Sequence, residues 1–189
     1  MAEGMNSMTP VDECDDRSFV ITRFFAAPRK LVYKMWTEPK HLAQWWGPWD
    51  FTNSVCQMDL RPGGAWRIVM RAPDATDYPL KGTFHEIVAP ERLVMSVDLS
   101  EHPESWHDMV DPARDKSKGR ARLADFWIVT FDEPNDVTKL TVTFRLDSAA
   151  TRDALLRIGM NEGWGQSLDR LEALAESFLD TTMLEGSAV

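Results

Sequence analysis

Glu86 and His85 stand next to each other in an apolar, alternating stretch, and both side chains could carry acid–base chemistry. In a strand Phe84 and Glu86 share one face, while His85 points the other way. A carboxylate on the apolar face would have a raised pKa and could act as acid, base or ligand anchor. The competing interpretation, which the sequence favours, is a strand-end glutamate paired with a nearby arginine.

Two further histidines, His102 and His107, lie close to Asp108 and Asp111. Their spacing matches no common metal motif, so we predict neither a metal site nor a cofactor. The sequence has no Gly-rich phosphate loop, no G-x-S-x-G nucleophile motif and no Cys–His pairing. This argues against hydrolysis, but cyclase-type chemistry needs only placed acids and bases in a dry chamber.

The charge of the chain limits its partners. The 189 residues carry a formal net charge of −9, and the sequence pI is about 4.9. The summed field therefore repels phosphate backbones and anionic membranes, and we expect neither nucleic acid nor membrane as a partner. The basic residues between 114 and 122 alternate along a stretch beside Asp111 and Asp115, which is typical of a solvated loop.

The cysteines and the first residues bear on the compartment. Cys14 and Cys56 are the only two cysteines, which suits a reducing environment. The N-terminus lacks the basic start and apolar stretch of a secretory signal, and no apolar run is long enough to span a bilayer. We expect one cytoplasmic domain at 17–180, between a disordered acidic tail at 1–16 and a flexible tail at 181–189.

The chemistry-bearing residues must be positioned by a regular series of elements. A proline near the first turn and another before the second segment predict two short helices, with His41 on an exposed face. Two-residue alternation predicts strands. The expected strands cover 18–26, 51–60, 65–71, 80–88, 92–98, 126–132 and 138–147, and the expected short helices cover 28–37 and 39–46.

The C-terminal part predicts one long helix. Ser148 is a suitable N-cap, and apolar residues recur at helical spacing to about Leu179. Gly159, Gly163 and Gly165 weaken its middle and would allow a local bend. Between the strands, residues 99–122 are expected to form a long loop or a short helix. Connections of this length are usually functional or mobile.

These elements predict an α+β fold, in which a curved antiparallel sheet of six to seven strands wraps around a long C-terminal helix. One helix cannot fill the concave side of such a sheet, so we expect an internal cavity there. The eight tryptophans suit either a thick core or the wall of an apolar pocket.

Several strings resemble the START-like (SRPBCC, helix-grip) superfamily and, within it, the branch named for the activator of heat-shock-protein-90 ATPase. The resemblance covers about 18–177 and implies the helix-grip fold. It implies no single function, because the superfamily includes lipid carriers, polyketide cyclases and co-chaperone domains. The strings are APRKLVYKMWTEP at 27–39, HLAQWWGP at 41–48, DLRPGGAW at 59–66, GTFHEI at 82–87, PERL at 90–93 and EGWGQSLDRL at 162–171.

Alternation and the resemblance together predict the cavity lining, although each residue could equally be ordinary core. The predicted lining residues are Trp66, Ile68, Met70, Phe84, Glu86, Met95, Trp127, Val129, Met160 and Trp164. The segment 99–122 looks longer than usual for this branch and could cover the mouth of the cavity. Its candidate lid residues are His102, Trp106 and His107.

Three functions stay open. The first is binding or sequestration of a small hydrophobic molecule. The second is a cyclase or dehydratase that uses Glu86, His85 or the pair His102 and His107. The third is a chaperone-interacting module, implied by the name of the branch alone. Whether the chain is an enzyme stays open, although binding is favoured. Assembly into a homodimer also stays open.

Overall fold

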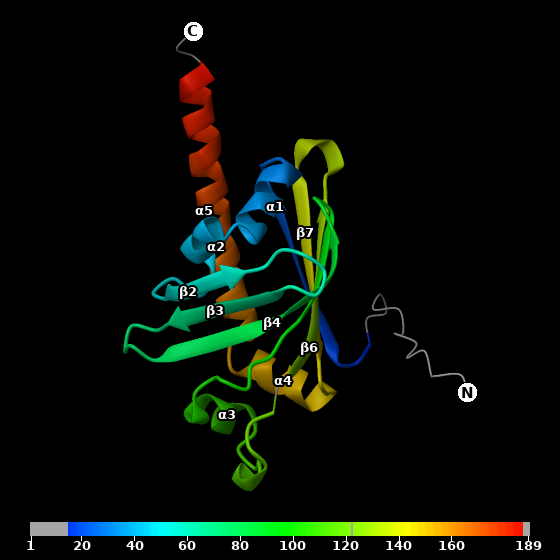
Figure 1. Ribbon diagram of the computed structural model, residues 1–189, viewed down its shortest axis with the longest axis vertical. Coiled ribbons are helices and arrows are strands. Elements are labelled where there is room, and N and C mark those ends of the chain that lie inside the picture. Colours follow the sequence, from blue (N-terminus) through cyan, green and yellow to red (C-terminus); the bar gives the residue numbers. More distant parts are fainter. Residues whose placement is uncertain (1–14, 122, 187–189) are drawn as a thin grey trace, which may run out of the picture.

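The computed structural model describes residues 15–121 and 123–186, without the side chains at 125, 136 and 181–186. The described strands form one seven-stranded antiparallel sheet in the order β1-β7-β6-β5-β4-β3-β2, which curves around the long helix α5 (Figure 1). The strands are β1 Ser18–Phe25, β2 Thr52–Met58, β3 Ala65–Arg71, β4 Asp77–Val88, β5 Arg92–Ser96, β6 Ala124–Asp132 and β7 Thr138–Leu146. The α+β helix-grip fold predicted from the sequence is confirmed.

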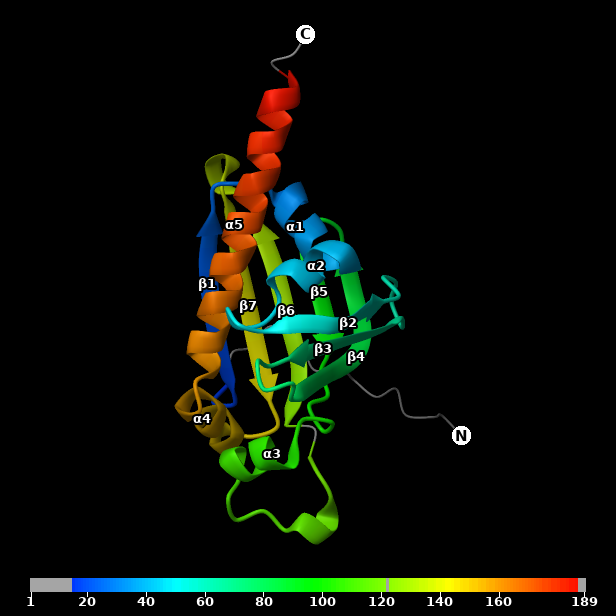
Figure 2. The same cartoon turned by 90° about the vertical axis from the view of Figure 1, so that its left-hand side faces the viewer.

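Helices lie on the concave side of the sheet and at one end of it. Two short helices follow β1, as expected, and α3 and α4 lie at the end of the molecule away from the C-terminus (Figure 2). The helices are α1 Arg29–Thr37, α2 Pro39–Trp45, α3 Glu104–Val110, α4 Ala149–Arg157 and α5 Met160–Gly186, with short 3-10 turns at Lys116–Lys118 and Pro134–Asp136.

The sheet is strongly bent. Strands β1, β7 and β6 run along α5, whereas β2 and β3 cross it in both views (Figure 2). The register of β4 against β5 shifts between Phe84 and Glu86. Such a bulge adds a residue to one strand and increases its bend. It also breaks the two-residue alternation, with the result that His85 and Glu86 are both exposed.

Helix α2 buries a residue that was expected to be exposed. The His41 side chain is only 5% exposed, and its ring meets Phe178 of α5 edge to face at 5.0 Å between centroids. Burial lowers the pKa of His41. The expectation of an exposed His41 is therefore wrong, because α5 covers the face of α2 that the local pattern left unassigned.

The C-terminal helix is two helices rather than one. The Ser148 hydroxyl accepts a hydrogen bond from the amide of Thr151 at 3.1 Å, so the predicted N-cap is confirmed. The first helix then ends before Gly159, whose φ of +94° lies in the left-handed region that favours glycine. The second helix continues to Gly186, past the predicted end near Leu179. Of the tails predicted at 1–16 and 181–189, residues 1–14 and 187–189 lie outside the described residues.

Tryptophans fill the middle of the space between sheet and helix. The ring of Trp164 on α5 lies 5.1 Å from Trp46, 5.4 Å from Trp127 and 4.9 Å from Phe144, all between centroids. Trp36 stacks on the same indole at 6.1 Å. These rings belong to one continuous buried core. The centre of the concave face is therefore packed.

None of the helices described here combines the length and apolar character needed to cross a bilayer.

Candidate functional site

An apolar pocket of about 300 Å³ lies between the tryptophan core and the end of the molecule that carries α3 and α4. Its walls come from the loop after α2, from β3 and β4, from the segment before and within α3, and from the junction of α4 with α5. The lining residues are Trp46, Gly47, Pro48, Phe51, Met70, Tyr78, Leu80, Leu99, His102, Trp106, Trp127, Leu155, Ile158, Gly159, Met160, Gly163, Trp164 and Ser167.

Part of the predicted cavity lining lies in this pocket. Met70, Trp127, Met160 and Trp164 contribute to its walls. Five other predicted residues are packed in the core instead, each no more than 6% exposed, and the ring of one of them, Trp66, lies 6.1 Å from that of Trp127. These five are Trp66, Ile68, Phe84, Met95 and Val129.

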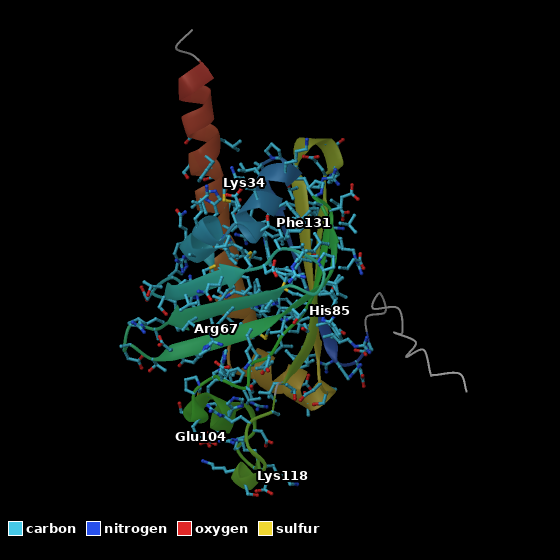
Figure 3. The ribbon with its side chains drawn as sticks, in the orientation of Figure 1. Lys34, Arg67, His85, Glu104, Lys118 and Phe131 are labelled. Carbon is cyan, nitrogen blue, oxygen red and sulfur yellow. The ribbon has the colours of Figure 1, made fainter. Side chains whose placement is uncertain are left out.

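Glu86 does not line the pocket. Its side chain is 48% exposed, and its Oε1 lies 3.1 Å from Nε of Arg92. The β4 bulge turns Glu86 away from the face that Phe84 occupies. His85 is also exposed, contacts Phe126 edge to face at 5.1 Å, and lies at the sheet side away from α5 (Figure 3). Of the two interpretations of Glu86, the structure supports the arginine-paired one.

The segment 99–122 forms one wall of the pocket and is fixed to the sheet by ion pairs. Glu101 accepts hydrogen bonds from Arg67 at 2.6 Å and from Lys81 at 2.5 Å. These bonds, that from Arg67 first, lower the pKa of Glu101 to about 2. Farther out, Arg114 pairs with Glu104 and Asp108, in the part of the segment labelled by Glu104 and Lys118 (Figure 3).

The three candidate lid residues line two different pockets. His102 and Trp106 line the apolar pocket, with their ring centroids 4.4 Å apart. His107 lines a second, more polar pocket of about 360 Å³, whose described lining residues include Arg114 and Arg120. The pair His102 and His107 therefore does not act on one shared space. Among the described residues, no three His, Cys, Asp or Glu side chains gather as metal ligands would.

His102 is a buried histidine with one anchored nitrogen. Its Nδ1 lies 2.9 Å from the carbonyl oxygen of Pro79, and the residue is 4% exposed. Burial lowers its pKa to about 4. The Tyr78 ring meets it edge to face at 5.5 Å, and Arg120 donates a hydrogen bond to its backbone carbonyl at 2.7 Å. The imidazole is therefore neutral at pH 7 and held on several sides.

The loop after α2 is held in place by α5. Arg170 Nη1 donates to the carbonyl oxygens of Gly47 at 2.9 Å and Pro48 at 2.7 Å, and Nη2 donates to that of Gln44 at 2.9 Å. The Asn53 amide adds a bond to the Trp46 carbonyl at 2.7 Å. Because this loop carries Trp46 and Pro48 into the pocket wall, Arg170 positions the wall without touching the pocket.

Several lining residues were missed from the sequence. Tyr78 was not predicted as a lining residue because β4 begins at Asp77, three residues before the predicted strand. Trp46 is one of the eight tryptophans of the chain, but strand alternation assigns no residue of its segment to the cavity. Signals for the rest were absent, because they meet only in the folded chain. These are Pro48, Phe51, Leu80, Leu99, Leu155, Ile158 and Ser167.

The pocket offers few polar groups. None of the described lining residues is Asp, Glu, Lys or Arg. The Ser167 hydroxyl donates to the carbonyl of Gly163 at 2.9 Å, one turn earlier in α5. The buried indole N–H of Trp127 has no hydrogen-bond partner within the described part of the chain. A pocket of this kind binds neutral, mostly apolar compounds and orients them with a few hydrogen bonds.

Comparisons with known proteins agree with the fold. A protein of Nitrosomonas europaea is 24% identical, with a TM-score of 0.72, over 89% of this chain and 99% of its own. One of Mycobacterium smegmatis is 23% identical, with a TM-score of 0.70, over 88% and 95%. The AHSA1 protein of Silicibacter pomeroyi is 22% identical, with a TM-score of 0.62, over 86% and 99%. These likenesses show the fold alone.

No curated protein matches the chain. Residues 26–176, however, match the family described as Activator of Hsp90 ATPase homolog 1-like protein. This stretch includes strands β2 to β7, helices α1 to α4 and most of α5, and it contains every residue that lines the apolar pocket. The chain belongs to the Activator of Hsp90 ATPase homolog 1-like family, within the START-like helix-grip fold.

Proposed function

We propose that the protein binds or sequesters a small, neutral and mostly hydrophobic molecule in the pocket beside α3. One observation carries the proposal: a space of about 300 Å³ is lined mainly by aromatic, aliphatic and thioether side chains, with no charged residue among the described lining. Its size is at the lower end of the range for ligand pockets, which favours a compact ligand.

The energetics support binding rather than empty packing. An apolar ligand that fills such a space removes both its own surface and the wall from water, at roughly 25 cal/mol per Å² of apolar area. The wall is largely preformed, because Arg170 holds the loop and Glu101 holds the α3 segment. A preformed site loses little free energy to ordering when the ligand binds.

A ligand screen by thermal unfolding tests the proposal. A compound that binds only the native state raises the melting temperature, and the rise grows with ligand concentration. At a hundred times its Kd, such a compound adds about 2.7 kcal/mol to the free energy of unfolding. We expect compact neutral aromatic compounds to do so and charged analogues to fail. A diverse set of such compounds that leaves the melting temperature unchanged contradicts the proposal.

A second candidate, a cyclase or dehydratase, keeps support from one residue. Of its proposed acid–base groups, only His102 lines the apolar pocket, and a neutral imidazole can take up a proton. Turnover of an apolar substrate that is lost in a His102→Asn variant, with ligand affinity retained, would favour this candidate over simple binding. No turnover of any substrate class leaves binding as the function.

A further inference from the structure

The hydrogen bond of His102 determines which of its nitrogens carries the proton. Nδ1 lies 2.9 Å from the carbonyl oxygen of Pro79. A carbonyl oxygen can only accept, so Nδ1 must donate, and a neutral imidazole has only one N–H. Nε2 is therefore left with a lone pair and is a hydrogen-bond acceptor.

No group among the described residues uses this acceptor. No described residue donates a hydrogen bond to Nε2, and the nearest rings, Tyr78 and Trp106, contact the imidazole through their ring systems. The one hydroxyl with a defined partner in the wall, on Ser167, donates to its own helix. A polar atom on an apolar pocket wall is costly to leave unpaired. A ligand donor would therefore gain a hydrogen bond there.

Protonation does not convert this acceptor into a donor under ordinary conditions. The pKa of His102 is about 4, chiefly because the ring is buried, with a smaller contribution from nearby His107. Two groups supply the anchoring: the Pro79 carbonyl on β4 and Arg120, which binds the His102 backbone. The acceptor therefore keeps its character from about pH 5 upward.

The remaining wall selects the shape and charge of the ligand. Indoles of Trp46, Trp127, Trp164 and Trp106 border the space, and aromatic rings pair best with one another in stacked or edge-to-face geometry. Without a charged residue among the described lining, an ionised ligand would lose its hydration with nothing to replace it. The volume of about 300 Å³ limits the ligand to a compact ring system.

We propose that the pocket takes a neutral aromatic compound of one or two rings that bears a hydroxyl group, and that this hydroxyl donates a hydrogen bond to Nε2 of His102. The inference rests on the proposed binding function and specifies its ligand class. His102 is in this view the residue that sets specificity, while the tryptophans provide affinity.

Two probes separate the hydroxyl from the ring. 2-Naphthol has the donor, and 2-methoxynaphthalene keeps the ring and the oxygen without the donor. Calorimetric titration, with protein injected into dilute probe at pH 7, gives both dissociation constants. For the wild-type chain we expect 2-naphthol to bind about tenfold more tightly, the usual worth of one buried hydrogen bond.

Two matched variants assign this preference to one nitrogen. In His102→Asn, the amide NH₂ can still donate to Pro79, but the acceptor at Nε2 is gone. We expect the preference to fall to about one, with binding of 2-methoxynaphthalene unchanged. His107→Asn removes the neighbouring histidine, which lies in the other pocket, and should keep the preference.

The outcomes distinguish the two levels of the account. If both probes bind the wild-type chain equally, or if His102→Asn keeps the preference, the hydroxyl assignment is overturned and apolar binding stands. If neither probe binds the wild-type chain, this inference fails. The proposed function also fails only if the wider set of neutral aromatic compounds does not bind either. A wild-type chain that shows no preference overturns the assignment even if a variant folds poorly.

Discussion

The guanidinium of Arg170 on α5 lies against the carbonyl of Pro48, with Nη1 and O 2.7 Å apart. The same group reaches four other backbone carbonyls of α2 and the loop after it, those of Gln44, Trp46, Gly47 and Phe51. No carboxylate of the described residues pairs with Arg170, and burial lowers its pKa. Backbone carbonyls thus take the place of a counter-ion, which ties one wall of the pocket to the helix.

Replacing Arg170 with Met is therefore expected to loosen the loop. The carbonyls lose a charged donor, and bonds to charged groups contribute more than neutral ones, so we expect a loss of about 3 kcal/mol in the free energy of unfolding. Urea unfolding measures this, and aromatic probes should bind more weakly as well. Arg157→Met, at an exposed arginine near the end of α4, is the control and should change neither quantity. Equal stability of the two variants would contradict the role of Arg170 in holding the loop.

The break between α4 and α5 depends on Gly159. Its φ is +94°, and a side chain there strains the backbone by about 1–2 kcal/mol. Gly165 stands within α5, and a Cβ there would meet no atom within 4 Å. We expect Gly159→Ala to lower the free energy of unfolding, and Gly165→Ala to raise it by about 1 kcal/mol through helix propensity. Urea unfolding of both variants tests this, and a stabilised Gly159→Ala would show that the helices can join.

The buried His102 should make stability depend on pH. Its pKa is about 4 in the folded chain against 6.5 for the ordinary group, so the unfolded chain binds more protons between these values. Stability therefore falls as pH decreases from about 6.5 to 4, by about 3 kcal/mol from this group. The loss of stability from protonation of Glu101 occurs at lower pH, between 4.5 and about 2, because its pKa in the folded chain is lowered.

The difference between wild type and His102→Asn isolates this effect, because other titrating groups are shared. Unfolding free energies at pH 7, 6, 5 and 4 should show the wild type losing about 3 kcal/mol more than the variant. Parallel curves would mean that the imidazole is accessible to protons in the folded chain, which would contradict its burial.

Glu86 is expected to be irrelevant to ligand binding. Its side chain is 48% exposed and pairs with Arg92 at the surface. An exposed ion pair contributes about 0–1 kcal/mol. Glu86→Gln should leave the affinity for aromatic probes unchanged in calorimetric titration, whereas a clear loss of affinity would mean that the carboxylate reaches the pocket.

Local patterns predicted what local forces determine. The strand at 65–71 has the same limits in the structure, because Trp66, Ile68 and Met70 share one face of it while Arg67 and Arg71 lie on the other. Ser148 caps a helix by a bond to a residue three positions away. Such features need no knowledge of the rest of the chain.

The candidate site was only partly predictable, because its limits depend on distant contacts. Alternation assigned Glu86 to the same face as Phe84, but a bulge against β5 reversed that, and no single strand encodes its partner's register. Trp66 carries the same pattern as Met70, yet it faces the indole of Trp127 while Met70 faces the pocket. Which tryptophans pack and which border open space is decided by tertiary packing.

The pocket itself can be tested by filling it from α5. Gly163 lines the pocket, and a Cβ there would meet only Pro48 Cγ at 3.8 Å, so Gly163→Leu would place its side chain in the ligand space. Gly165→Leu adds the same side chain to the same helix outside the pocket lining. The decisive measurement is the calorimetric affinity of an aromatic probe for these two variants. We predict that Gly163→Leu weakens binding by about tenfold or more while Gly165→Leu binds as the wild type does. Unchanged binding by a folded Gly163→Leu protein would contradict the pocket as the ligand site.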